Sequence, residues 1–263
     1  MNDTKIPWAD STINFISGCY HNCPYCYAKR IAERFATRTE ELKYAIERAQ
    51  AEGNSIIVAL DKPVCIEKNG KMVKQPYPYG FIPTFHRYKL NDVMRWKKPR
   101  NIFVGSMSDC FGAWVPEDWL MDIFDACEEA PQHNYLFLTK NPRRYLEMGT
   151  NGTLPVADNM WYGTTVNRRD DPYFFDTVRH TFLSIEPMFE DFDNINGRIP
   201  EWIIVGAETG NRKDKIIPKK SWLLQLVDQC REHHIPLFMK ESLKGIWKGE
   251  LIQEYPEGLR HER

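Results

Sequence analysis

The sequence has no long hydrophobic run. No segment approaches the roughly 18 consecutive apolar residues that a membrane-spanning helix needs. The first residues, MNDTKIPWADSTINF, are polar and lack the apolar centre of a secretion signal. These absences predict a cytoplasmic protein with no membrane partner.

An excess of one charge is also missing. Lys and Arg together number 35 and Asp and Glu number 36, so the net charge is −1. This balance excludes an overall polycationic surface for nucleic acid, although a local patch is allowed. Basic residues do cluster beside expected loops, namely Lys97, Lys98 and Arg100; Arg143 and Arg144; Arg168 and Arg169; and Lys213, Lys215, Lys219 and Lys220. A nucleic acid or nucleotide is therefore one substrate hypothesis, and a solvated surface is the alternative.

Paired cysteine knuckles, the usual signature of structural zinc, are absent. Of the seven cysteines, three lie within eight residues and the others are scattered at positions 65, 110, 127 and 230. Isolated cysteines in apolar surroundings behave as small hydrophobic residues. In a reducing compartment the cluster of three favours a metal site over a disulfide framework.

Hydrophobic residues make up 42% of the 263 residues, which is enough for one large core. Apolar strand-like runs alternate with amphipathic segments, a pattern typical of parallel βαβ units. The runs cover residues 12–16, 81–85, 102–105, 135–138, 160–165, 181–185, 202–205 and 236–239, and the helical segments cover 28–51, 116–129, 142–148 and 219–233. We predict an α/β fold in one domain, residues 1–263: a partial or complete (β/α) TIM-like barrel of six to eight mostly parallel strands.

One interval interrupts this alternation. Residues 55–79 contain Asn69-Gly70 between apolar and basic flanks. Asn-Gly readily adopts the positive φ angles of a two-residue hairpin turn. The sequence therefore predicts a small β-hairpin insertion here.

Polar residues follow most of the apolar runs. They are Ser106, Ser108 and Asp109; Lys140; Thr164 and Thr165; Glu186; Glu208; and Lys240. Functional side chains gather at the carboxyl ends of parallel barrel strands. The repetition predicts a shared pocket, whereas any single one of these residues could simply begin a solvated loop.

The most specific feature is a cysteine motif after the first strand. Cys19, Cys23 and Cys26 have the spacing C-x3-C-x2-C on one short loop before a helical segment. Three thiolates can bind three corners of an iron–sulfur cube and leave the fourth iron open to a substrate or cofactor. The alternative is a zinc site with His21 as the fourth ligand.

This motif, with the aromatic Tyr25 before its last cysteine, resembles the radical S-adenosylmethionine (radical SAM) superfamily. The resemblance extends to a phage-associated branch with no settled substrate. It covers the entry at residues 8–19, FVGSMSDCF at 103–111, APQHNYLFLTKNPR at 130–143, FLSIEPM at 182–188 and WIIVGAETG at 202–210. The barrel of that branch looks similar to spore photoproduct lyase, which is an analogy of fold.

The resemblance implies a barrel of the radical SAM type and a set of ligands. Cys19, Cys23 and Cys26 would hold a [4Fe–4S] cluster that reductively cleaves S-adenosyl-L-methionine (SAM) to a 5′-deoxyadenosyl radical. The residues expected to contact SAM are Tyr25, Ser106, Ser108, Asp109, Lys140, Thr164, Thr165 and Asn167. The Gly-Gly-Glu segment that superfamily members carry on an early strand is not evident here, which leaves the ligand of the SAM amino group undecided.

The radical would abstract hydrogen from a substrate that the sequence does not identify. Candidates for a catalytic role are Glu186, Glu208, Cys110 and Lys240, and the expected partner is an electron donor such as flavodoxin or ferredoxin. SAM could be consumed or, as in a repair lyase, regenerated. The alternative to an enzyme is a metal-stabilised barrel without catalysis that binds nucleic acid.

Overall fold

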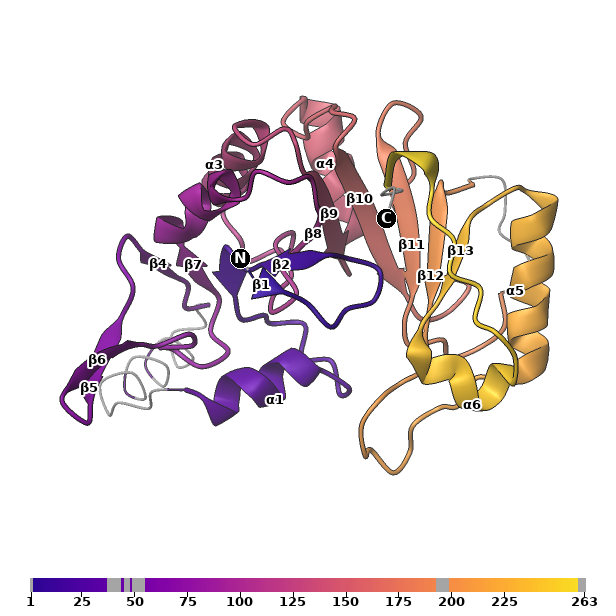
Figure 1. Ribbon diagram of the computed structural model, residues 1–263, viewed down its shortest axis with the longest axis horizontal. Coiled ribbons are helices and arrows are strands. Elements are labelled where there is room, and N and C mark those ends of the chain that lie inside the picture. Colours follow the sequence, from indigo (N-terminus) through magenta and orange to yellow (C-terminus); the bar gives the residue numbers. More distant parts are fainter. Residues whose placement is uncertain (1, 37–43, 45–47, 49–54, 193–198, 260–263) are drawn as a thin grey trace.

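The computed structural model describes residues 2–36, 44, 48, 55–192 and 199–259 (Figure 1). Its main element is an eight-stranded sheet in the order β1-β2-β8-β9-β10-β11-β12-β13. The strands are β1 (Asn2–Asp3), β2 (Ser11–Ile13), β8 (Asn101–Val104), β9 (Asn134–Thr139), β10 (Met160–Val166), β11 (His180–Ile185), β12 (Trp202–Val205) and β13 (Leu237–Met239). β1 is antiparallel to β2, and the other seven strands are parallel.

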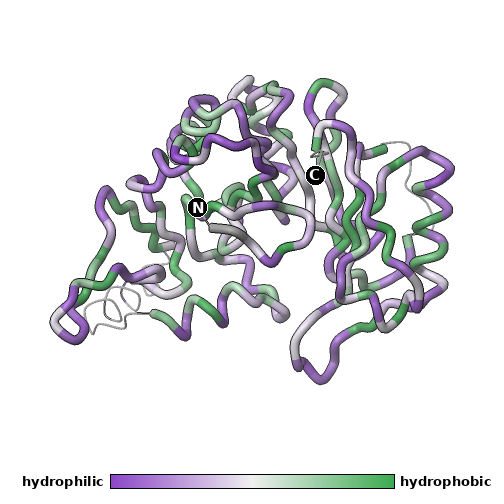
Figure 2. Tube along the Cα trace, viewed as in Figure 1, coloured by the Kyte–Doolittle hydropathy of each residue, from purple (hydrophilic) through white to green (hydrophobic). Residues whose placement is uncertain are grey.

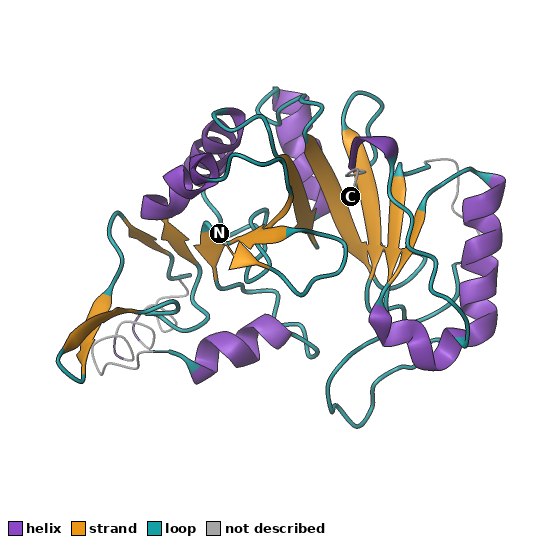
Figure 3. Cartoon of the chain, in the orientation of Figure 1, coloured by secondary structure: helices purple, strands orange, loops and turns teal. Residues whose placement is uncertain are grey.

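This parallel sheet curls into a half-barrel. β1 and β13 form its two edges and do not pair with each other, so the barrel is partial. Three helices cover its convex face: α3 (Glu117–Glu128), α4 (Pro142–Asn151) and α5 (Lys220–Glu232) (Figure 3). The short helices α1 (Tyr27–Arg34) and α6 (Lys244–Trp247) lie at the end of the sheet to which β10–β13 point (Figure 1). The prediction of six to eight mostly parallel strands in an α/β fold is confirmed.

Alternate residues of each strand face the two sides of the sheet. On the helix side, Phe137 and Tyr162 stack with ring centroids 5.8 Å apart and belong to the core under α3 and α4. On the concave side, Phe182 packs with Trp202 and with Trp8, which precedes β2. Figure 2 shows the resulting apolar residues along the strands of the large sheet. Aromatic side chains therefore fill much of the interior of the half-barrel.

Gly163 allows this interior to pack. A Cβ atom at Gly163 would lie 2.2 Å from the ring of Phe182, which stands beside it in the neighbouring strand. Because no side chain tolerates such a contact, glycine at this position makes room for the phenylalanine.

Two small sheets stand apart from the half-barrel. β3 (Ile16–Ser17), β7 (Thr84–His86) and β4 (Val58–Leu60) form one, and β5 (Cys65–Lys68) pairs with β6 (Lys71–Lys74) in the other. Asn69 and Gly70 join β5 to β6 with φ angles of 53° and 73°, so the predicted hairpin is confirmed. Its strand residues are all exposed, and Figure 2 shows a hydrophilic tip.

Three predictions about single elements need correction. The predicted strand 12–16 is divided between β2, in the main sheet, and β3, in one of the small sheets. The run 81–85 does not join the main sheet: its end forms β7, which pairs with β3 and β4. The predicted helix 28–51 begins as α1 but ends at Arg34, where the backbone of Phe35 caps it, and most of the remainder lies outside the described residues. Within the described residues, the connections also contain three 3₁₀ helices, Arg87–Arg95, Glu241–Leu243 and Glu257–Leu259. In the described parts of the chain, no helix has both the length and the apolarity to cross a membrane.

Candidate functional site

A cavity of about 260 Å³ lies at the carboxyl end of the half-barrel. Its floor is apolar and includes Ile6, Trp8, Phe103 and Leu138. Thirteen of the residues singled out from the sequence line it: Cys19, His21, Cys23, Tyr25, Cys26, Ser106, Ser108, Asp109, Lys140, Thr165, Glu186, Glu208 and Lys240. The predicted shared pocket is therefore present, with a polar rim above a hydrophobic base.

The three motif cysteines occupy one wall of this cavity. Their loop begins at Gly18, which has a φ of +88° and where a Cβ atom would lie 2.3 Å from the carbonyl oxygen of Ile82, so that no other residue fits. Gly18 also forms a bridge with Ser108, beyond the end of β8. All three thiols are free and partly exposed.

The sulfur atoms of Cys19 and Cys26 accept backbone hydrogen bonds from residues two or three positions later. Cys26 Sγ accepts from the N–H of Lys29 at 3.3 Å and so caps the N-terminus of α1. Cys19 Sγ accepts from the N–H of His21 at 3.5 Å. Such hydrogen bonds and a helix N-terminus both stabilise negative charge on sulfur, as a metal-bound thiolate requires.

The same thiols are costly to ionise on their own. Burial raises the pKa of Cys19 to about 12, and the neighbouring Asp109, Cys23 and Cys26 add to the effect. Burial also raises the pKa of Cys23, which Lys140 partly offsets. A cationic group bound between the sulfurs would remove this penalty, since thiolate ligands are deprotonated on metal binding.

A site for a single metal ion is the alternative use of these cysteines. Among the described residues, no three His, Cys, Asp or Glu side chains are grouped closely enough to hold one metal ion. In an iron–sulfur cube each thiolate binds a different iron, so its ligands surround the group instead of converging on one point. His21, the expected fourth zinc ligand, is bonded to Asp109.

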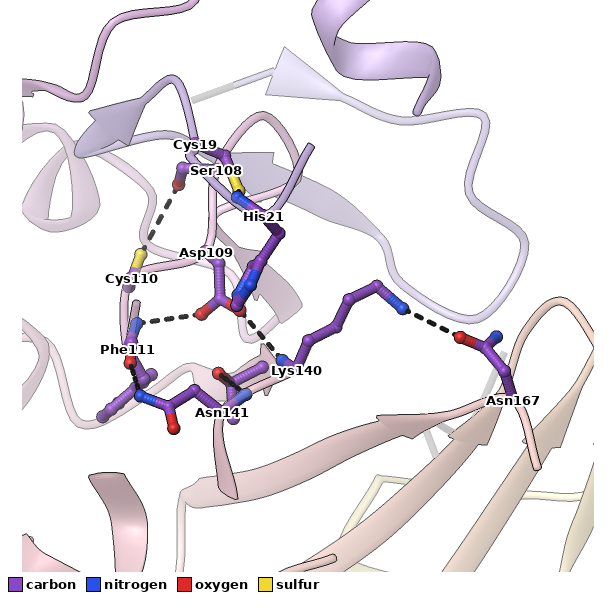
Figure 4. A network of polar contacts seen from close by, with 10 residues as sticks. Cys19, His21, Ser108, Asp109, Cys110, Phe111, Lys140, Asn141 and Asn167 are labelled. Carbon is purple, nitrogen blue, oxygen red and sulfur yellow. Dashed lines mark hydrogen bonds and ion pairs between the residues drawn. The ribbon is translucent and has the colours of Figure 1, made fainter. Parts of the chain in front are cut away.

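Asp109 lies at the centre of the polar contacts shown in Figure 4. Its Oδ2 lies 2.7 Å from His21 Nε2 and accepts from the N–H of Lys140 at 2.8 Å, and its Oδ1 accepts from the N–H of Phe111 at 3.0 Å. The side chain is 7% exposed. The protein itself therefore supplies three partners to a carboxylate that the sequence assigned to SAM.

Tyr25 joins the cysteine loop to the end of β10. Its hydroxyl donates to Asn167 Oδ1 at 2.8 Å, and the Lys140 ammonium lies 5.3 Å from the ring centroid and 3.5 Å from the same Asn167 oxygen. Burial lowers the pKa of Lys140. Asn167 does not line the cavity but orients two residues that do.

The rim near β8 is held by a second set of contacts. Ser106 Oγ lies 3.2 Å from both polar side-chain atoms of Asn14, and Tyr27 donates through its hydroxyl to the carbonyl oxygen of Ser106 at 2.6 Å. Ser108 Oγ lies 3.7 Å from Cys110 Sγ. The hydroxyls of Ser106 and Ser108 thus stand in the cavity wall beside the cysteine loop.

The opposite rim carries two ion pairs. Lys240 donates to Glu186 directly beside Gly206, where a Cβ atom would lie 3.1 Å from Lys240 and 3.3 Å from Glu186. Glu208 accepts two hydrogen bonds of 2.7 Å from Arg212, and these hold the pKa of Glu208 below its usual range. The structure therefore offers paired carboxylates and cations at this side of the cavity.

Three predicted residues do not line the cavity: Asn167, described above, and Thr164 and Cys110. Thr164 faces the other side of β10, where its hydroxyl accepts from the N–H of Phe174 at 3.1 Å. Cys110 is 3% exposed and packs in the core under α3. Thr164 is adjacent to Thr165, and Cys110 is adjacent to Asp109, and both of these neighbours line the cavity. The direction in which the local backbone points each side chain decides which residue of the pair reaches the cavity.

The sequence pattern did not identify every residue here. Trp8, Tyr27 and Ser184 line the cavity, and the sequence analysis assigned none of them a role in the site. His21 was weighed as a zinc ligand, not as a partner of Asp109. A second cavity of about 340 Å³ lies against the same loop and is lined by Lys29, Arg30 and Arg212 in addition to residues shared with the first: Cys23, Tyr25, Cys26, Glu208 and Thr209.

Several basic residues of the expected surface clusters have acidic partners. Arg143 pairs with Glu147, Arg144 with Glu117, Arg168 with Glu190, and Arg169 with Asp191. These pairs reduce the positive charge available to a nucleic acid at those loops.

Comparison with known protein families identifies a match over nearly the whole chain. The family model described as "Protein of unknown function (DUF5131)" matches residues 3–255. No curated protein and no solved structure matches the chain.

Proposed function

The chain belongs to the family described as proteins of unknown function (DUF5131), and from its site we propose that it is a radical SAM enzyme. Under this proposal the half-barrel is of the radical SAM type, a TIM-like barrel left open. The observation that carries the proposal is the position of three free thiols. Cys19, Cys23 and Cys26 share one wall of a cavity at the carboxyl end of a parallel half-barrel.

In this proposal the three cysteines hold a [4Fe–4S] cluster. When bound, the cluster and SAM supply a 5′-deoxyadenosyl radical that abstracts a hydrogen atom from the substrate. The backbone N–H groups of His21 and Lys29 stabilise two of the thiolates through the bonds described above.

The remaining cavity residues would bind and orient SAM and substrate. Lys140 is a cation beside Cys23 that can pair with a carboxylate, and Ser106 and Ser108 offer hydroxyl oxygens to an ammonium group. Thr165 lines the wall at the end of β10, where it can contact ribose hydroxyls. The apolar floor excludes water from the reaction, which protects a reactive radical.

Glu186, Glu208 and Lys240 are the residues we assign to the substrate side. A nucleotide or nucleic acid is the substrate class to test first, and a one-electron donor such as flavodoxin or ferredoxin is the partner that the proposal requires.

The test begins with anaerobic purification and reconstitution with iron and sulfide. We expect about four irons per chain, a reduced-state EPR signal that changes on addition of SAM, and slow formation of 5′-deoxyadenosine. The triple variant C19A/C23A/C26A should lose all three, and Cys65→Ala, which removes a cysteine outside the cavity, should lose none.

A different metal content would contradict the proposal. One tightly held zinc per chain with no response to SAM would refute the enzyme proposal. A metal-stabilised barrel that binds without catalysis would then take its place.

A further inference from the structure

We infer that Asp109 is a positioning residue that fixes the cysteine loop against the ends of β8 and β9 through His21. The identity of the group that the loop holds rests on the proposed function. The positioning itself follows from contacts of the protein chain.

The two ends of the cysteine loop are fixed by backbone interactions. At its start, the N–H of Gly18 donates to the carbonyl oxygen of Met107 at 2.9 Å. At its end, Cys26 begins helix α1. Between these points lie seven residues that include Asn22, which has a positive φ of 53°, so backbone pairing of the loop ends does not by itself fix the middle.

Side-chain contacts hold the middle, and the one to Asp109 is the most buried. His21 stands between Cys19 and Cys23 in the sequence and lies 2.7 Å from a carboxylate that is 7% exposed. The hydroxyl of Tyr20, its neighbour, donates to the carbonyl oxygen of Ile56 at the surface. A hydrogen bond to a buried carboxylate is worth more than one exposed to water, because water does not compete for it.

Asp109 is itself held rigidly. Its other two contacts are backbone N–H groups, from Phe111 in its own loop and from Lys140 at the end of β9, as Figure 4 shows. Backbone donors of this kind fix the carboxylate independently of the cysteine loop. Asp109 therefore links His21 to the chain segments that follow β8 and β9.

An aromatic contact reinforces the same junction. Trp114, on the connection from β8 to α3, meets the ring of His21 edge-on at 4.9 Å and the ring of Tyr20 at 5.5 Å. Gly112 permits this position, since a Cβ atom there would lie 2.3 Å from the indole. The connection after β8 thus contacts His21 by a hydrogen bond and by packing.

The test measures thiol reactivity in the iron-free protein. Alkylation of Cys19, Cys23 and Cys26 by iodoacetamide is followed by mass spectrometry, and exposed Cys65 in the same chain is the internal reference. His21→Ala removes the tether and leaves the charge of Asp109 in place. We expect the three loop cysteines to react about fivefold faster, as when one buried hydrogen bond no longer opposes local opening.

Two further variants separate positioning from general destabilisation. His21→Gln keeps an N–H donor and should restore slow alkylation. Asp176→Asn is the control for general destabilisation, since Asp176 accepts from a backbone N–H two residues later, pairs with Arg179, and lies far from the loop in sequence. It should leave the alkylation rates of the loop cysteines unchanged.

The inference fails if His21→Ala leaves the three rates unchanged, if His21→Gln does not restore them, or if Asp176→Asn raises them equally. After reconstitution, His21→Ala should also lose iron to a chelator several-fold faster than the wild type. A wild-type protein that binds no iron would refute the proposed function alone, because the alkylation rates would still decide the role of Asp109.

Discussion

The hydroxyl of Tyr25 donates a hydrogen bond of 2.8 Å to Asn167, 142 positions later in the chain. This contact joins the cysteine loop, which follows β3, to the end of β10 on the far side of the cavity. Asn167 is held in turn, since its amide group donates to the carbonyl oxygen of Pro187 at 2.8 Å. The loop is thus anchored to two separate strand ends, through Asp109 and through Asn167.

Replacement of Tyr25 by Phe should weaken this anchor without disturbing the fold. The ring remains beside Lys140, and the lost hydrogen bond should lower the free energy of unfolding by about 1 kcal/mol, measured by urea denaturation. Tyr79→Phe is the control, because the Tyr79 hydroxyl has no bonding partner in the part of the chain that the structure describes. Equal stability of Tyr25→Phe and the wild type would show that the contact does not form in solution.

Cys26 combines a helix cap with a proposed cluster ligand, and two substitutions separate these roles. Serine retains an acceptor at the N-terminus of α1, whereas alanine does not. Cys26→Ala should therefore be about 1 kcal/mol less stable than Cys26→Ser in the iron-free protein. Both should lose cluster binding after reconstitution, measured as iron per chain. Retention of the full iron content by either variant would contradict the ligand assignment.

The pair formed by Glu208 and Arg212 should be strongly coupled. The Glu208 side chain is 1% exposed, so Arg212→Gln leaves a buried carboxylate with no guanidinium partner. We expect Arg212→Gln to lower the unfolding free energy, because the carboxylate then lacks its two hydrogen-bond donors. In the double variant E208Q/R212Q part of this loss should be regained, as a double-mutant cycle would show. Additive effects of the two changes would mean that the interaction between Glu208 and Arg212 does not contribute to stability.

His86 should make the protein sensitive to acid. It is fully buried, its Nε2 lies 2.8 Å from Ser17 Oγ, and burial lowers its pKa from 6.5 to about 3. Between these values the unfolded chain binds a proton that the folded chain does not, so stability falls as the pH falls from 6.5 towards 3. The contribution is about 1.4 kcal/mol per pH unit.

Comparison with His86→Gln isolates this effect from other titrating groups. The unfolding free energy of both proteins is measured by urea denaturation at several pH values between about 4 and 7. The wild type should lose stability more steeply than the variant below pH 6.5. Parallel curves would indicate that folding does not lower the pKa of His86.

Local sequence patterns predicted the elements that local physics controls. The alternation of apolar runs and amphipathic segments located β8–β13 and α3–α5, because a strand buried on both faces and a helix with one apolar face have different periods. Asn69-Gly70 specified a hairpin turn for the same local reason, its tolerance of positive φ. The spacing of the three cysteines required a compact loop, and their position before α1 followed from the sequence as well.

The tertiary structure decided which of the strand-end residues meet. Thr165 faces the cavity and Thr164 does not, because successive side chains of a strand point to opposite faces and the register selects one of them. Residues 81–85 looked like a barrel strand, yet long-range pairing with β3 and β4 places β7 in a separate sheet. The partners of Asp109 come from positions 21, 111 and 140. Sequence alone determines that these groups exist, and only the folded chain brings them within hydrogen-bonding distance.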